Sequence, residues 1–254
     1  MYLALGFRPW PLFGRIAASA FPAALLVGIK TGNWVLGLIL AVLAVTGVSL
    51  GWFKDLIKEW AVGSSTSYER AIFRKGFGLF IVREVILFFS FFWTFFHRRL
   101  APTPELGRIW PPIGINAIEI GVPLLNTGLL LLSGVRLTWS HHCLYQGLIK
   151  EARLSLFLTV LLGSVFLAVQ MFEYNSASFT FADRVFGRIF FLATGFHGAH
   201  VIAGARILLT IFFITKNPIP QGGYSIFDFR AWYWHFVDVV WLFLFVCVYW
   251  WGRC

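Results

Sequence analysis

Seven long apolar runs constrain the architecture of this sequence more than any other feature. They cover residues 11–29, 34–53, 76–96, 122–140, 154–174, 189–214 and 232–251. Each run is close to the roughly 20 residues that cross a bilayer as an α-helix. A backbone in lipid must satisfy its own hydrogen bonds, and the alternating pattern of a membrane β-barrel is missing from the sequence. We therefore predict an all-α integral membrane protein with seven transmembrane helices.

Composition supports a membrane protein over a soluble one. The chain is 59% hydrophobic and 13% charged, whereas soluble domains are roughly 45–50% apolar and about 25% charged. The net charge of +10 also suits a nucleic-acid binder, but the basic residues are scattered over short loops instead of clustered on one face. We therefore expect no nucleic-acid partner.

The three cysteines form no CxxC motif and predict neither a disulfide framework nor a zinc site.

The loops between the runs are too short to hold a second domain. The longest are predicted at 54–75, 97–121 and 215–231, and domains generally need at least about 50 residues. Residues 1–254 are therefore predicted to form a single polytopic membrane domain. Lys and Arg are somewhat more frequent in loops on the N-terminal side, which favours that side as the positive-inside face.

Glu84 is the most unusual residue within a run. It lies about eight residues into the third run, so roughly 12 Å from the N-terminal face at 1.5 Å per residue. An intramembrane carboxyl group is costly and suggests proton-linked or reactive chemistry. The alternative is a neutral Glu that hydrogen-bonds to a neighbouring helix. A proton-coupled secondary transporter using Glu84 is the alternative function, although the broken helices or paired halves of transporters are not clear in the sequence.

Other polar residues recur within the runs or at their ends. Metal or haem ligation by histidine is one hypothesis. Against it, His197 and His200 lie near mid-depth while His235 lies near the end of a run, and the Glu-x-x-His pairs of di-iron bundles do not occur. We expect no metal in this chain. Instead we predict polar contacts between helices for His97, His141, His142, Gln170, Glu173, His197, His200, His235 and Asp238.

Two further sets of polar residues have lipid as a candidate partner. For Gln170 and Glu173, near the end of the fifth run, lipid contact is the alternative to an inter-helix role. After the second run, cationic and aromatic side chains lie together at the predicted interface, where phospholipid head groups suit them. The alternative to lipid binding, equally supported by the sequence, is a helix end that is simply exposed to water. The residues concerned are Trp52, Lys54, Lys58 and Glu59.

Seven segments, taken together and in order, resemble cytochrome c oxidase subunit III of the mitochondrial type, within the haem-copper oxidase subunit III family. They are FFWTFFH at 91–97, LAPTPELG at 100–107, WPP at 110–112, VPLLNT at 122–127, TWSHH at 138–142, ATGFHGAHV at 193–201 and AWYWHFVDVVW at 231–241. The resemblance covers about residues 50–252.

The resemblance implies a fold and a role. It implies two helices and five helices on either side of a lipid-filled V-shaped cleft, with structural phospholipids. It also implies a non-redox core subunit of the oxidase that reduces O2 to water with electrons from cytochrome c and pumps protons. This subunit would pack on subunit I, with subunit II and accessory subunits as further partners. Its expected location is the mitochondrial inner membrane, with the N-terminus on the matrix side.

The resemblance also assigns cofactors and residue roles. Haem a, haem a3 and copper are implied in partner subunits, and this chain is implied to hold no redox centre and no catalytic residue. Its implied tasks are stability, proton uptake, and lipid and oxygen access for subunit I. Glu84 matches the carbodiimide-reactive membrane carboxylate of the family, and Lys58 and Glu59 match a lipid-contacting cluster.

Several arginines stand where the family pattern has serine. An arginine at the centre of a span costs roughly 2.5–3.5 kcal/mol on insertion scales. One hypothesis is that AGA and AGG codons, read as Ser or Gly in several animal mitochondrial codes, are written here as Arg. The rival is that genuine arginines snorkel or pair with lipid phosphate. The serine positions are those of Arg83, Arg98, Arg99, Arg136, Arg188 and Arg253, and Arg206, which lies within a run, is in question with them.

Overall fold

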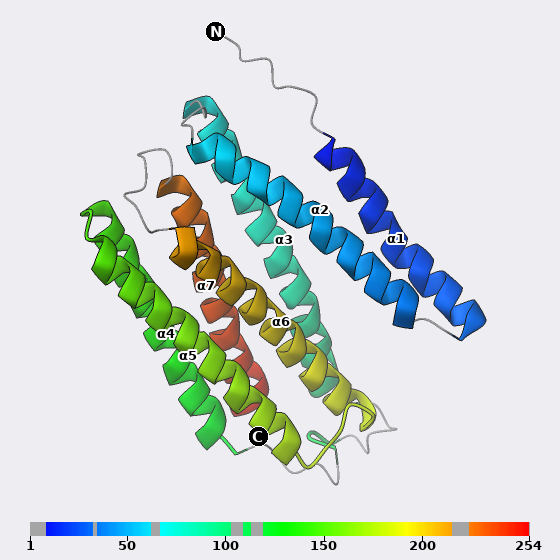
Figure 1. Cartoon of the computed structure of the whole chain (residues 1–254). Coiled ribbons are helices and arrows are strands. Elements are labelled where there is room, and N and C mark those ends of the chain that lie inside the picture. The colour runs from blue at the N-terminus through cyan, green and yellow to red at the C-terminus, as the bar shows by residue number, and fades with distance from the viewer. Residues whose placement is uncertain are drawn as a thin grey trace. The chain divides into compact units, whose positions relative to one another are not determined.

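The computed structural model describes residues 9–32, 35–61, 67–102, 109–112, 119–214 and 224–253. Throughout these ranges the regular elements are helices (Figure 1), and seven of them are long and apolar enough to cross a membrane. The predicted all-α membrane fold with seven spans is therefore confirmed. The contacts divide the chain into two compact units, Met1–Ser65 and Thr66–Cys254, which are described in turn. The prediction of one membrane domain over residues 1–254 stays a prediction.

The first unit contains α1 (Trp10–Thr31) and α2 (Val35–Ala61), which pack against each other. Helix α1 ends at Gly32, whose φ of 73° is the left-handed conformation that glycine adopts readily. A Cβ on Gly51 of α2 would lie 2.5 Å from the Trp10 ring. The absence of a side chain there lets the indole lie flat on α2, where its Nε1 donates a hydrogen bond to Asp55 Oδ2 at 2.9 Å.

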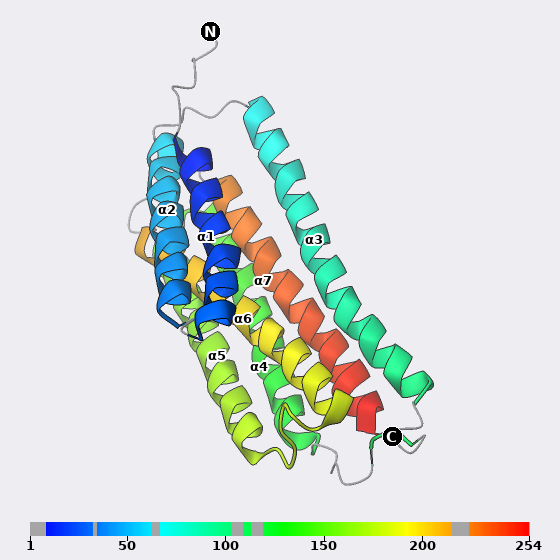
Figure 2. The same cartoon turned by 90° about the vertical axis from the view of Figure 1, so that its right-hand side faces the viewer.

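The second unit contains five long helices. They are α3 (Ser67–Leu100), α4 (Gly121–Tyr145), α5 (Ile149–Ser176), α6 (Arg184–Ile214) and α7 (Tyr224–Leu244), followed by the π-helix η3 (Phe245–Trp250) and the 3-10 helix η4 (Trp251–Arg253). The contacts α4–α5, α5–α6, α6–α7 and α7–α4 close a four-helix ring, and α3 packs on α6 and α7. Figure 2 shows α3 running beside α7 on one side of this ring.

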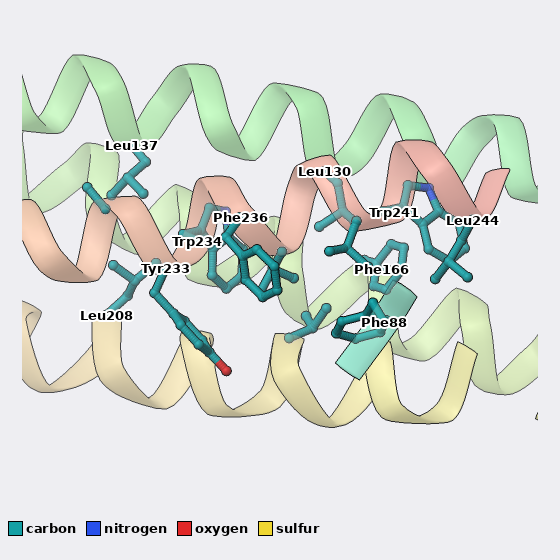
Figure 3. Close-up of a cluster of buried hydrophobic side chains, with 14 of the residues drawn as sticks. Phe88, Leu130, Leu137, Phe166, Leu208, Tyr233, Trp234, Phe236, Trp241 and Leu244 are labelled. Atoms are coloured by element: carbon teal, nitrogen blue, oxygen red, sulfur yellow. The ribbon is translucent and has the colours of Figure 1, made fainter. Parts of the chain in front are cut away.

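Two tryptophans of α7 fill the centre of the ring. Trp234 and Trp241 are seven residues apart, two helical turns, and both are almost fully buried. The Trp234 indole donates to Ser133 Oγ at 2.9 Å, and the Trp241 indole donates to Thr127 Oγ1 at 3.0 Å. Both acceptors belong to α4, so two hydrogen bonds fix α7 against α4 inside an apolar core (Figure 3).

The helices extend beyond the predicted apolar runs. Helix α3 is 34 residues long and starts at Ser67, although the run predicted only 76–96. Residues predicted as loop at 54–61, 67–75 and 224–231 are helical, because polar residues continue each helix past its apolar part. Glu84 accordingly lies deeper than predicted, about 20 Å along α3 from the start of its apolar stretch at Ala71.

Candidate functional site

Buried Glu84 and partly buried His200 form a polar pair that joins α3 to α6. Glu84 is 7% exposed, and its Oε2 lies 3.1 Å from His200 Nε2. The two residues are 116 positions apart in the chain and meet because α3 packs on α6. Both lie near the middle of their spans, Ala71–Leu100 and Val185–Phe213. The structure therefore brings together two residues that were each singled out in the sequence.

The second ring nitrogen of His200 determines where the protons are. Nδ1 lies 2.7 Å from the backbone carbonyl oxygen of Phe196. A carbonyl oxygen only accepts, so Nδ1 carries a hydrogen. Nε2 therefore faces Glu84 either as the bare nitrogen of a neutral ring or as the second N–H of an imidazolium. In the first case the Glu84 carboxyl supplies the proton, and in the second the imidazolium supplies it to a carboxylate. Either way, one proton lies between the two side chains.

Aromatic rings surround the imidazole of His200. The ring of Phe88 lies edge-on to it at 5.1 Å between centroids, Tyr233 stacks on it at 6.3 Å, and Phe236 approaches at 6.4 Å. These apolar walls keep water away from the Glu84–His200 pair. An electrostatic contact in such surroundings is stronger than it would be in water.

Arg83 also contacts Glu84, although adjacent residues on a helix point about 100° apart. Its side chain is 72% exposed, and its guanidinium donates a hydrogen bond to Glu84 Oε1. The long arginine side chain reaches back along the surface of α3 to make this contact. Each Glu84 oxygen therefore has its own partner, one exposed and one buried.

A second histidine–carboxylate contact lies where α4 ends and α7 begins. His141 Nε2 is 2.8 Å from Asp228 Oδ1, and the Tyr145 hydroxyl donates to the same oxygen at 3.4 Å. The ring of Phe227 stacks on the imidazole at 5.2 Å. His141 therefore lies at a contact between α4 and α7. Asp228 was not singled out, because it fell in a segment predicted to be a loop.

The remaining polar residues of α3, α4 and α7 make weaker or local contacts, and His235 lies in the middle of α7 and not near an end as predicted. His235 Nε2 lies 3.4 Å from Thr138 Oγ1, and its Nδ1 lies 3.8 Å from Asp238 Oδ2. His142 contacts Gln146 one turn further along the chain, at 2.9 Å. His97 is exposed on the last turn of α3, and its ring forms no hydrogen bond within the part of the chain that the structure describes.

His197 lies in the interior of the ring and does not meet His200. It is 1% exposed, with Phe166 edge-on at 5.7 Å and Trp241 tilted over it at 5.2 Å. Neither ring nitrogen has a hydrogen-bond partner among the described residues. Both histidines lie on α6, three residues apart. The sequence did not predict that His200 would contact α3 while His197 would lie in the core.

Gln170 links three elements inside the ring. Asn126 Nδ2 of α4 donates to Gln170 Oε1 at 3.3 Å, and Gln170 Nε2 donates to the Tyr249 hydroxyl of η3 at 3.2 Å. Glu173, one turn further along α5, is 3% exposed and interacts with Tyr249. Asn126 and Tyr249 were missed in the sequence. An amide within an apolar run was the signal for Asn126, whereas nothing in the sequence signals the π-helix that positions Tyr249.

The lipid-binding candidates belong to α2, in the first unit. Trp52 is 36% exposed, and Lys54 is also exposed. The side chains of Lys58 and Glu59 lie outside the described residues.

Metal ligation has no support from the described part of the chain, in which no three His, Cys, Asp or Glu side chains gather in a group that would hold an ion.

Comparison with known proteins places this geometry in a family. Residues 1–253 match the family model described as cytochrome c oxidase subunit III. A relative named cytochrome c oxidase subunit 3, from Branchiostoma lanceolatum, is 47% identical over 251 residues, which cover 96% of this chain and 94% of the relative. Relatives of the same name from Paracentrotus lividus and Mammuthus primigenius are 47% and 45% identical, with the same two coverages.

These matches extend over nearly the whole chain and confirm the family suggested by the seven segments. They support the oxidase reading and do not favour the alternative of a proton-coupled transporter. Together with the seven apolar helices, they describe a multi-pass membrane protein of the respiratory chain. The chain belongs to the cytochrome c oxidase subunit III family.

Proposed function

We propose that this chain is a non-redox core subunit of the oxidase that reduces O2 to water with electrons from cytochrome c and pumps protons. In this proposal it packs on subunit I and supports its stability, proton uptake and access to lipid and oxygen. Haem a, haem a3 and copper reside in partner subunits, with subunit II and accessory subunits completing the complex. The chain lies in the mitochondrial inner membrane, with its N-terminus on the matrix side.

The buried Glu84–His200 pair is the observation that carries the proton-linked part of the proposal. It places one proton between a carboxyl group and an imidazole, 3.1 Å apart, near the middle of two spans. Intramembrane ionisable residues by default indicate function. Because both partners are titratable, the pair can exchange this proton internally without any movement of the backbone. A carboxyl group in this position is also the expected target of a carbodiimide, which reacts with protonated carboxyls.

The lipid part of the proposal rests on two exposed residues of α2. Trp52 and Lys54 present an aromatic ring and a cation on exposed positions of α2. This pairing suits the polar head group of a phospholipid at a membrane interface. We propose Trp52, Lys54, Lys58 and Glu59 as contacts for structural phospholipids in the two-plus-five arrangement around a lipid-filled cleft.

The first experiment is a reduced-minus-oxidised visible spectrum of the complex purified through this chain from native membranes. We expect haem a absorption in the intact complex and none on this chain after it is stripped from its partners. Haem that stays with the isolated chain contradicts the non-redox role. A complex without haem contradicts the assignment to the oxidase as a whole.

The proton-linked role is tested in the same complex with Glu84→Gln, which keeps the size of the side chain and removes its acid. We expect slower proton uptake and faster loss of activity during turnover, with haem content unchanged. Glu151→Gln is the matched control, because Glu151 is exposed on the first turn of α5. Equal behaviour of the two variants overturns the role assigned to Glu84.

A further inference from the structure

A second buried polar cluster lies inside the helical ring, apart from the Glu84–His200 pair. It comprises Asn126 of α4, Gln170 and Glu173 of α5, and Tyr249 of η3. All four side chains are at most 4% exposed. Four polar side chains from three elements therefore lie together in an interior whose packing is mainly apolar and aromatic.

The hydrogen bonds in this cluster run in one direction. Asn126 donates to Gln170 at 3.3 Å, and Gln170 donates to the Tyr249 hydroxyl at 3.2 Å. The Tyr249 oxygen thereby accepts, so its own O–H remains available to donate, and Glu173 lies near enough to interact with it electrostatically without completing a hydrogen bond. Successive donors of this kind polarise one another and fix the orientation of each group.

Both ends of the chain of hydrogen bonds are incomplete. Asn126 Oδ1 is buried at one end without a hydrogen-bond partner among the described residues. At the other end, neither Glu173 oxygen makes a hydrogen bond of standard geometry within that same part of the chain. Leaving a buried polar group unsatisfied destabilises the folded protein, because the group loses its hydrogen bonds to water and gains none in return. Native proteins commonly meet such a cost with ordered water.

The π-helix is an independent sign that this interior is specialised. Eight residues separate Trp241 from Tyr249, and on a regular α-helix that spacing would turn Tyr249 about 80° away from the face of Trp241. The wider turn of η3 instead leaves Tyr249 3% exposed, with its ring centroid 5.7 Å from that of Trp241. Single π-turns within α-helices are frequent at functional sites. Here the turn brings the hydroxyl to Gln170 and Glu173.

We propose that the interior between α4, α5 and η3 binds ordered water, which hydrogen-bonds to Glu173 and to Asn126 Oδ1. The water satisfies Asn126 Oδ1 at one end of the Asn126–Gln170–Tyr249 chain and the Glu173 carboxyl group beside its other end. The water holds these side chains in place and does not conduct protons through the interior. The amides of Asn126 and Gln170 lie between the two ends of the chain, and amides do not relay protons as water or carboxyl groups do.

The direct test is a density map of the purified complex at a resolution that shows water. We expect a water peak within hydrogen-bond distance of the Glu173 carboxyl and another near Asn126 Oδ1. The proposal is overturned if the map resolves these side chains without water, or if a lipid or partner-subunit group occupies the place. If the map shows no water there and the thermal stability of the complex depends on sodium, the proposal is overturned in favour of a bound cation.

Variants at one position add a second readout. In Glu173→Gln the side chain keeps its hydrogen-bonding groups, so the water peak and the infrared water band that shifts in H2¹⁸O should remain. In Glu173→Leu both should be lost. Phe172→Leu is the matched control, because Phe172 is the adjacent residue and is 65% exposed. If Glu173→Leu does not assemble, the wild-type and Glu173→Gln maps still decide, because a Glu173→Gln map without water contradicts the proposal.

Discussion

Trp234 lies directly on the backbone of Gly163, so that a Cβ at that glycine would be 2.7 Å from the indole ring. The opposite side of the same ring contacts Gly204, where an added Cβ would be 2.9 Å away. Trp234 of α7 is thus held between glycines of α5 and α6 while its Nε1 donates to Ser133 of α4. One fully buried side chain contacts every other helix of the ring, and its fit depends on two residues without side chains.

Gly163→Ala should therefore destabilise the complex. The added methyl group collides with a large ring that has no room to move, and such overpacking typically costs about 1–3 kcal/mol. The measurement is the midpoint of thermal unfolding in mild detergent. Gly128→Ala is the control, because a Cβ at Gly128 of α4 meets no atom within 4 Å. Equal midpoints for the two variants would contradict the packing described for Trp234.

The sequence was sufficient to predict the number and type of the helices, because each apolar run matches the thickness of a bilayer. It could not predict the ends of those helices, where polar residues continue α3 back to Ser67. Within the site, Glu84 and His200 were each recognisable as polar groups in a span. Their contact was not predictable, since it depends on how α3 rotates against α6.

Some features of the interior left no trace in the sequence. His197 and His200 are three residues apart on α6, yet His200 contacts Glu84 whereas His197 is enclosed by Phe166 and Trp241. The small rotation between residues three apart is enough to send them to different neighbours. Tyr249 reaches Gln170 only through the π-turn of η3, a local irregularity that no periodic pattern predicts.

The Glu84–His200 contact should appear as a coupling energy in a double-mutant cycle. The variants are Glu84→Gln, His200→Leu and the two combined, each measured by unfolding in detergent. We expect a coupling of about 0.6 kcal/mol, the average for polar pairs between membrane helices, and no more than about 1.7 kcal/mol. A cycle with His97→Leu in place of His200→Leu is the control, since His97 is exposed at the end of α3. A coupling near zero for the first cycle would show that the pair adds nothing to stability.

The α1–α2 unit offers a matched pair of glycines one helical turn apart. A Cβ at Gly51 would lie 2.5 Å from the Trp10 ring, whereas a Cβ at Gly47 meets no atom within 4 Å. Gly51→Ala should displace the indole and weaken its hydrogen bond to Asp55, at a cost of about 1–3 kcal/mol. Gly47→Ala should be neutral or slightly stabilising, because alanine favours the helix more than glycine does. Near-ultraviolet circular dichroism of tryptophan during thermal unfolding measures both.

The exposed arginines within the spans give a prediction about the native polypeptide itself. Arg136 and Arg206 present exposed side chains within the apolar stretches Gly121–Tyr145 and Val185–Phe213. A charge near the middle of a span is costly, so we expect the chain from native membranes to carry serine at position 136, as the family pattern suggests. Its intact mass should then fall below the 28.9 kDa of the printed sequence, and a peptide spanning position 136 should identify the residue. CGN codons and an arginine-containing peptide would instead establish a genuine cation, which must snorkel along its helix to a lipid phosphate.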